Sequence, residues 1–259
     1  MIDKKRIGIV IIATNAYFVL GIRFIKKFMQ HYKGNSEIKF YCFSNQNGDE
    51  YVSDNIDVTF IKDNHLDWVS ATNSKFKNII NIENKLINEV DYVYYFDADT
   101  NILKKFTEEW FIGDMVGGEH FANATVLSNG KGFDRNPISN AYVPEDSKLL
   151  YTYYYGAFFG GNTLNTINFC KILSRYQIED QLKGYEPPVN DESYINAYFH
   201  YNPPTHTILS KNFEFVISDK GGLNDMRNPN LNISHIKTQM LENKFKIFDL
   251  ENGNLKIFE

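Results

Sequence analysis

The sequence predicts an α/β fold, and three observations support that prediction. Apolar runs rich in β-branched and aromatic residues recur along the chain, segments with helical spacing separate them, and polar residues follow one of the runs directly. Strands that alternate with helices form parallel sheets covered on both faces, and ligands bind outside the carboxyl ends of such strands. We therefore expect a ligand site at one edge of a central sheet.

The first elements are the clearest. Residues 6–14, RIGIVIIAT, form a continuous apolar run, which is typical of a strand buried on both faces. Apolar residues at helical spacing predict an amphipathic helix over 16–32. The runs IKFYCFS (38–44) and VTFI (58–61) are the next strands, and 70–89 has the pattern of a second helix.

The strand VYYF (93–96) is followed directly by Asp97 and, two residues later, by Asp99. In an extended segment residues i and i+2 point the same way, so both carboxylates can face one cation. Mg²⁺ and Mn²⁺ take carboxylate oxygens together with substrate phosphates. A strand-terminal Asx turn explains the same pair, so a metal site and a structural turn both remain open.

The following stretch, 118–152, contains scattered Gly, Asn, Ser and Pro and is predicted to be an irregular loop. YYYGAFFGGNT (153–163) precedes a helix that runs to about 182. Its glycines allow close approach of backbone to a ligand, or a tight strand-to-helix turn.

EPPVNDES (186–193) has the form of a helix start, with Asn190 as the cap and acidic residues in the first turn. Acidic residues there stabilise a helix through its dipole, and this structural role is one interpretation of Glu192. The same field would keep Glu192 ionised, which suits a nucleophile or an electrostatic partner of an oxocarbenium ion.

The tail 246–258 alternates around an Asn-Gly pair and is predicted to be a β-hairpin, part of a C-terminal extension over about 243–259. No repeat or low-complexity linker interrupts the 259 residues, so we expect one domain over 1–259. Cys42 and Cys170 stand among large apolar residues, which indicates a buried, reduced pair.

Composition excludes several classes of function. The chain is 43% hydrophobic and 15% aromatic, so it is globular, and its net charge of −5 argues against nucleic-acid binding. No apolar run reaches the length of a transmembrane segment or has the form of a signal peptide, so we expect a cytoplasmic protein, at most peripheral to the inner membrane face. The Gly-rich phosphate loops of nucleotide-binding proteins do not occur, so a bound nucleotide needs another source of positive charge.

The segments DYVYYFDAD, GGEH, NAYVPED, YYYGAFFGG and NDESYINAYF, followed by TILS, occur in this order along the chain. Together they resemble the catalytic domain of glycosyltransferase family six, which includes the histo-blood-group A and B transferases, the α-1,3-galactosyltransferase and bacterial relatives. The resemblance runs from about residue 6 to about residue 240. It implies a type-A glycosyltransferase fold, which is Rossmann-like with a mixed central sheet.

The family's chemistry, implied here by the resemblance, is retaining transfer of galactose or N-acetylgalactosamine from a UDP-sugar to a galactoside-terminated glycan in α-1,3 linkage. Asp97, Ala98 and Asp99 match the family's DxD motif, which holds Mn²⁺ (or Mg²⁺) against the donor diphosphate. Glu192 matches the catalytic glutamate, a covalent nucleophile or an ion-pair stabiliser, and Asp191 would contact the donor sugar.

The remaining matches are residues that bind donor or acceptor. Ile12, Ala13 and Tyr17 match a segment that holds uracil and ribose, Trp68 and Lys75 match a Trp and an Arg, and Lys237 matches a Lys that reaches the diphosphate. Tyr155, Gly156 and Ala157 match the segment that sets donor choice, while His120, Val189, Asn190 and Glu192 match acceptor-binding positions.

Several positions depart from the family pattern. Lys75 replaces an Arg, Val189 and Asn190 replace a Trp-His pair, and Gly132 stands where a Thr is expected. Acceptor identity, including any need for fucose, is therefore open. By the resemblance, Ala157 with bulky Tyr155 favours galactose over N-acetylgalactosamine, because the family's A and B enzymes have Gly there for N-acetylgalactosamine, which leaves room for the acetamide, and Ala for galactose. The alternatives to a transferase are a non-catalytic sugar- or nucleotide-binding module on the same fold, or a metal-dependent phosphoesterase, which would need a third ligand near Asp97.

Overall fold

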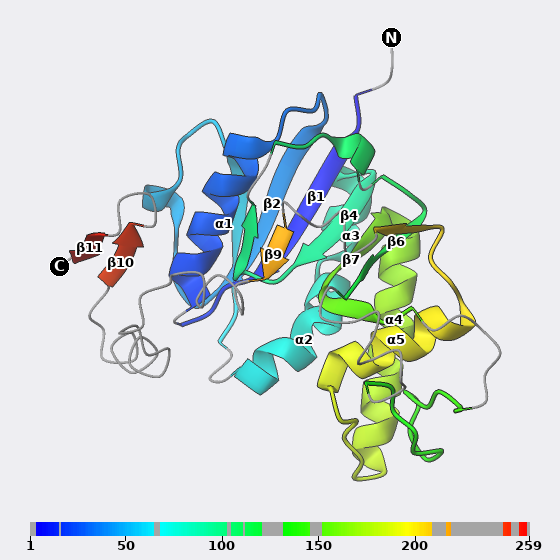
Figure 1. Cartoon of the computed structure of the whole chain (residues 1–259). Coiled ribbons are helices and arrows are strands. Elements are labelled where there is room, and N and C mark those ends of the chain that lie inside the picture. Colours follow the sequence, from blue (N-terminus) through cyan, green and yellow to red (C-terminus); the bar gives the residue numbers. More distant parts are fainter. Residues whose placement is uncertain are drawn as a thin grey trace.

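The protein is described by a computed structural model that covers residues 4–15, 17–64, 68–102, 105–110, 112–120, 132–145, 152–208, 216–218, 246–249 and 254–257 (Figure 1). The strands are β1 (Arg6–Ile12), β2 (Glu37–Ser44), β3 (Asp57–Lys62), β4 (Tyr92–Phe96), β5 (Thr100–Ile102), β6 (Met115–Glu119), β7 (Tyr154–Asn162), β8 (His206–Ile208), β9 (Val216–Ser218), β10 (Lys246–Asp249) and β11 (Asn254–Ile257). The α-helices are α1 (Tyr17–His31), α2 (Trp68–Asn81), α3 (Glu83–Glu89), α4 (Thr163–Leu182) and α5 (Asn190–Tyr201), and the 3₁₀ helices are η1 (Asp49–Tyr51) and η2 (Glu108–Trp110).

Seven strands form the central sheet in the order β3-β2-β1-β4-β7-β6-β8. The first four are parallel, as expected for strands linked through helices. β7 then runs antiparallel to both β4 and β6, and β8 is parallel to β6. The sheet is therefore mixed, which confirms the predicted α/β class. The parallel sheet predicted from strand–helix alternation holds for only one half.

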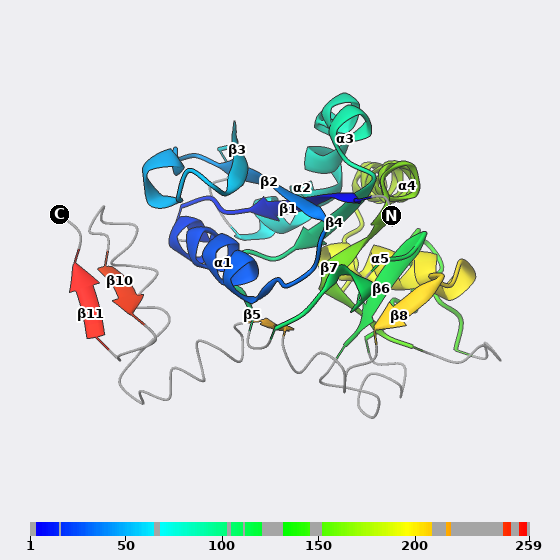
Figure 2. The same ribbon diagram turned by 90° about the horizontal axis from the view of Figure 1, so that it is seen from above.

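Two hydrophobic clusters pack against the two faces of the sheet. Alternate residues of β1 divide between them: Ile9 and Ile11 join the cluster that contains α1, while Val10 joins the cluster that contains α2 to α5. Figure 2 shows α1 on one side of the sheet and α3 and α4 on the other. Covering both faces requires every strand position to be apolar, which explains the continuous apolar run in β1.

Three expectations about local structure are wrong. The helix expected over 70–89 is two helices, α2 and α3, which meet at Ile82. Asn190 does not cap α5; Val189 holds the cap position without a side-chain bond, and Asn190 is the first helical residue with φ of 40°. The loop expected to begin at residue 118 begins later, because residues 118 and 119 belong to β6.

The hairpin expectation is confirmed, because β10 and β11 pair antiparallel on either side of the Asn-Gly pair. Cys42 and Cys170 are buried free thiols, also as predicted, and burial raises the pKa of Cys42 to about 12. No helix in the described part of the chain has the length and apolar character needed to cross a membrane.

Candidate active site

The aspartates of the DxD motif lie in a turn at the carboxyl end of β4. The Asp97 amide donates to the carbonyl of Ala157 at 3.0 Å, and the Thr100 amide donates back to the Asp97 carbonyl at 3.0 Å. The segment is therefore not extended, and the expectation that alternation alone aims the two carboxylates together is wrong. Ala98 is buried, whereas the Asp97 side chain is 37% exposed.

Lys75, in the middle of α2, joins this turn to the start of α5. Its side chain is only 2% exposed, and its Nζ lies 2.7 Å from Asp191 Oδ2 and 3.5 Å from Asp97 Oδ1. The same ammonium donates to the Gly156 carbonyl at 3.1 Å and lies 4.7 Å from the centre of the Tyr95 ring. A buried ammonium needs such partners. Moving an unpaired ion from water into the protein interior costs on the order of several kcal/mol of free energy. We call Lys75, Asp97, Asp191 and Glu192 the Lys75 cluster.

The charges within the Lys75 cluster follow from burial and pairing. Burial lowers the pKa of the Lys75 ammonium, but the carboxylates of Asp191 and Asp97 more than offset this and raise it. Burial raises the pKa of Asp191 to about 6, although Lys75 lowers it. The Lys75 ammonium therefore stays charged at neutral pH, and Asp191 is largely ionised beside it because a pKa of about 6 still lies below 7.

Glu192 is held against β7 by backbone. Its Oε2 accepts a hydrogen bond of 2.7 Å from the Gly156 amide. A β-carbon at Gly156 would lie 3.0 Å from Glu192 Cβ and 3.2 Å from Asp191 Oδ2, so the close approach of α5 to β7 depends on glycine. Burial raises the pKa of Glu192 to about 7, and this opposes the expectation that the helix field keeps it ionised.

Two residues that the sequence did not single out position Glu192. Asn196, which is buried, accepts from the Tyr154 amide at 2.7 Å and donates to the carbonyls of Tyr154 and Glu192 at 2.9 and 2.8 Å. The Tyr153 phenol interacts with the Glu192 carboxylate and lowers its pKa. Asn196 lies one helical turn after Glu192, and this spacing within a predicted helix is the only sequence signal for its role.

The first strand and helix approach the DxD turn. Burial, and then the Asp99 and Asp97 carboxylates, raise the pKa of the Tyr17 phenol to about 12, which places Tyr17 within electrostatic reach of both. Ile12 and Ala13 are buried at the end of β1, so their side chains belong to the core. A ligand would meet these two residues chiefly through their backbone.

The sequence profile of Glycosyltransferase family 6 matches residues 2–239. The chain belongs to this family. Its mixed seven-stranded sheet agrees with the type-A glycosyltransferase fold implied by the resemblance.

Curated relatives of the family-6 chain include animal and bacterial proteins. It is 26% identical over 207 residues to histo-blood group ABO system transferase 2 of Rattus norvegicus, a match covering 78% of this chain and 61% of the relative. Globoside alpha-1,3-N-acetylgalactosaminyltransferase 1 of Gallus gallus is also 26% identical over 207 residues, covering 77% and 59%. O-antigen biosynthesis glycosyltransferase WbnI of Escherichia coli is 27% identical over 167 residues, covering 64% and 70%. The matches thus span about 60% of the length of the two animal proteins.

Several residues that match acceptor-side positions of the family can be placed relative to β7 and α5. The His120 ring packs edge-on against Tyr155 at 4.9 Å, and the His120 amide donates to the Tyr153 carbonyl. Gly132 is buried, and its carbonyl accepts from the Tyr153 phenol at 3.3 Å. Val189 is 37% exposed at the start of α5 and is open to a ligand. The Trp68 side chain and Lys237 lie outside the described residues.

The carboxylates of Asp97 and Asp99 fit a hard divalent cation, because each offers oxygen ligands at the end of a buried strand. No group of three or more His, Cys, Asp or Glu side chains in the described ranges is arranged to hold a metal. The donor set thus suits an ion whose coordination is completed by substrate oxygens and water. It does not suit a site built from protein alone.

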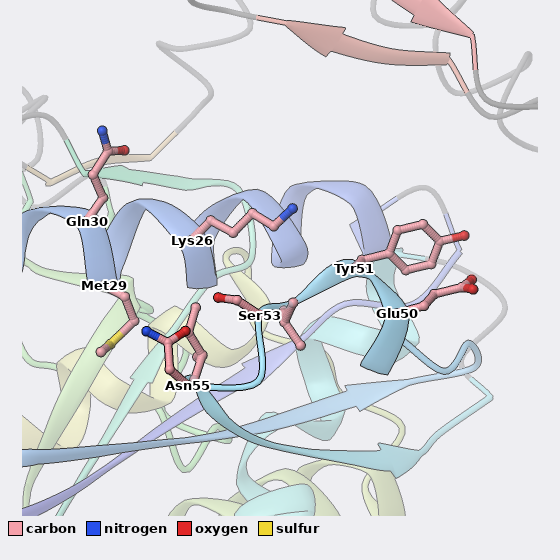
Figure 3. A pocket seen from close by; sticks show the side chains of 9 residues that line it. Lys26, Met29, Gln30, Glu50, Tyr51, Ser53 and Asn55 are labelled. Atoms are coloured by element: carbon pink, nitrogen blue, oxygen red, sulfur yellow. The ribbon is translucent and has the colours of Figure 1, made fainter.

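A hollow of about 580 Å³ lies between α1 and the segment after η1 (Figure 3). Lys26, Met29 and Gln30 project from α1 on one side of it, and Ser53 and Asn55 lie on the other. None of the residues that match the family's functional positions lines this hollow, so we place the candidate site at the Lys75 cluster.

Proposed function

We propose that the chain is a retaining hexosyltransferase that moves galactose or N-acetylgalactosamine from a UDP-sugar to a galactoside-terminated glycan in α-1,3 linkage. The observation that carries this proposal is the Lys75 cluster, in which one buried ammonium joins the DxD turn to the Asp-Glu pair of α5. Family membership supports it, as do two relatives whose names state a glycosyltransferase and an α-1,3-N-acetylgalactosaminyltransferase. The cytoplasmic location expected from the sequence stays a prediction.

In this proposal Glu192 acts on the sugar carbon from which UDP departs. The Gly156 amide fixes one carboxylate oxygen and so orients the carboxylate to act as nucleophile or to stabilise positive charge on the sugar ring. Either role requires the carboxylate form. Binding of the donor and acceptor in fixed orientation then supplies the remaining rate acceleration.

Asp191 is proposed to bind a hydroxyl of the donor sugar. Its Oδ2 is buried and pairs with Lys75 Nζ, which lies 2.7 Å away. The remaining lone pairs of a buried carboxylate also need hydrogen-bond donors, and a sugar hydroxyl would supply one. Lys75 keeps this carboxylate charged and in place.

We propose that a divalent cation, Mn²⁺ or Mg²⁺, is held by Asp97 and Asp99. Lys75 is one cation facing the carboxylates of Asp97, Asp191 and Glu192, so the cluster has no surplus positive charge for a diphosphate. The Gly-rich phosphate loops are also absent from the sequence. When bound, the ion would neutralise the diphosphate of the leaving UDP.

Ala157 supports galactose as the donor sugar. Its side chain is 3% exposed and its carbonyl accepts from the Asp97 amide, so this position lies directly beside the DxD turn. Any added side-chain volume there reduces the space for an acetamide group. The acceptor beyond its terminal galactose is not specified by the positions of Val189 and Asn190, which differ from the family pattern.

The test is UDP release from UDP-galactose and from UDP-N-acetylgalactosamine, each with lactose as acceptor and with either Mn²⁺ or EDTA. We expect release with Mn²⁺, faster with UDP-galactose, and none in EDTA. Unchanged release in EDTA would refute the metal assignment, and Asp97→Asn should mimic EDTA. UDP binding without release from either donor would instead support the non-catalytic binding module.

A further inference from the structure

A second, polar hollow lies where α2, α4 and α5 pack together, on the side of α5 away from Glu192. Its volume is about 270 Å³, which suits one small ligand and is below the usual range for drug-sized molecules. We call it the amide pocket. It is lined by Asn73, Gln177, Gln181, Gly184, Tyr185, Glu186, Pro187, Asn190 and Tyr194.

The chemistry of the amide pocket selects against anions. Four side-chain amides supply both donors and acceptors, and the only charged side chain of the lining is Glu186. The phenols of Tyr185 and Tyr194 donate to Asp134 and Asp180, so they add acceptor oxygens only. None of the lining residues is Lys, Arg or His, so a phosphate or a nucleotide would find no counter-charge. A neutral ligand rich in hydroxyl groups fits this lining.

Gln177 gives an independent indication of a ligand. The residue is 7% exposed, yet its Nε2 has no hydrogen-bond partner in the described part of the chain. Buried polar groups are almost always paired, because an unpaired donor loses its bonds to water without replacement. A hydroxyl oxygen in the amide pocket would supply the missing acceptor after a small rotation of the amide.

The position of the amide pocket relates it to the acceptor. Asn190 and Tyr194 both line the pocket, whereas Glu192, two residues before Tyr194, lies about 200° around α5 from it. A ligand in the amide pocket therefore does not touch the Glu192–Gly156 contact. Asn190 is also an acceptor-side position by the family pattern, so a glycan could pass from the Lys75 cluster around the first turn of α5.

We propose that the amide pocket binds a neutral sugar residue of the acceptor glycan, remote from the galactose that receives the transferred hexose. The inference rests on the proposed function for its link to the acceptor. The binding of neutral sugar itself rests only on the lining residues and the unpaired Gln177 amide.

Two variants test the amide pocket. Gln177→Leu removes the unpaired amide at similar volume, and Gln181→Ala removes an exposed amide of the rim, where folding is not at risk. Gln30→Ala, an exposed glutamine in α1, is the matched control. Melting temperatures establish that each variant is folded.

The first measurement is saturation-transfer NMR with a galactose-terminated tetrasaccharide and with methyl β-galactoside, which needs no transfer activity. We expect contacts to the inner sugars of the tetrasaccharide in the parent and in Gln30→Ala, and their loss in Gln177→Leu and Gln181→Ala. Retention of these contacts in both pocket variants would overturn the proposal. Absence of inner-sugar contacts in the parent would overturn it as well.

The second measurement is kcat/KM for the two acceptors. The tetrasaccharide should be preferred by the parent, and the pocket variants should lower that preference about three- to tenfold, the scale of one hydrogen bond. An unchanged preference would count against the pocket. If the parent transfers to neither acceptor, the proposed function fails, and the NMR result still decides whether the amide pocket binds sugar.

Discussion

Lys75 Nζ lies 2.7 Å from Asp191 Oδ2, and both side chains are almost completely buried, at 2% and 5% exposed. This pair joins the middle of α2 to the first turn of α5, and the further contact to Asp97 extends it to the end of β4. Lys in place of the family's Arg supplies a single point charge, and its one Nζ serves two carboxylates and a carbonyl.

Lys75→Met should destabilise the protein by about 3–5 kcal/mol, because it leaves the buried Asp191 carboxylate without its counter-charge. The double variant Lys75→Met/Asp191→Asn should recover a large part of this loss, because no unpaired buried charge remains. Urea unfolding at pH 7 measures both. Lys26→Met, on the exposed face of α1, should change little. Equal stability of Lys75→Met and the parent would show that the pair is not an ion pair.

The ionisation of Glu192 should make stability depend on pH. Its pKa of about 7 in the folded protein exceeds the ordinary value of 4.5, so the folded state binds this proton more tightly than the unfolded chain. Stability from this group is therefore fully present at low pH and is lost as pH rises from 4.5 through 7.

Glu192→Gln should accordingly raise the melting temperature at pH 8 by about 2–4 °C, equivalent to about 1 kcal/mol for a domain of this size. The gain should shrink toward pH 5, where Glu192 is itself protonated. Glu109→Gln, at an exposed position, is the control and should show no such trend. A gain at pH 5 as large as that at pH 8 would contradict the raised pKa.

The core strands were predictable because burial on both faces leaves a continuous apolar signal. β1, β2 and β4 carry that signal, and their predicted limits agree with the structure within about two residues. β6 escaped prediction because Met115–Glu119 contains two glycines and lies between two neighbouring strands, where backbone pairing compensates for weak propensity. No Gly or Pro stands near Ile82 in the sequence, so no local signal marks the break between α2 and α3.

The candidate site was predictable in its parts but not in its connections. The DxD and Asp-Glu segments stand out as carboxylates after a strand and at a helix start. Lys75 is indicated only by the family resemblance and Asn196 by nothing beyond its spacing, because a polar residue within a helix normally faces water. Only the packing of α2 against α5, and of α5 against β7, buries them, and sequence periodicity does not report that packing.

Asn196→Asp should reduce kcat while UDP affinity changes little. The substitution places an oxygen against the carbonyls of Tyr154 and Glu192, where the amide now donates, and it costs about 1–3 kcal/mol in stability. Glu192 is then held less firmly while the DxD turn is unchanged. Asn202→Asp, at the far end of α5, is the matched control. UDP-release kinetics and UDP titration measure the two effects, and a parallel loss of both would indicate a general structural role.

Gly156→Ala tests whether the close approach of α5 to β7 sets the rate of transfer. The new β-carbon would lie 3.0 Å from Glu192 Cβ and 3.1 Å from Glu192 Oε2, so the glutamate must shift by a few tenths of an ångström. Asn196 ties α5 to β7 on the next turn, which limits how far the helix can retreat. Because small displacements of catalytic groups are costly, we expect kcat to fall about 10- to 100-fold with UDP affinity retained.

Gly113→Ala is the control for Gly156→Ala. Its β-carbon would also approach a side chain to 3.0 Å, that of Val116, but at a position remote from the Lys75 cluster. We expect this variant to keep kcat, whatever its effect on the melting temperature. If Gly113→Ala lowers kcat as much as Gly156→Ala, crowding in general is responsible. If Gly156→Ala keeps the parent's kcat, the Gly156–Glu192 contact does not position the Glu192 carboxylate for the proposed transfer.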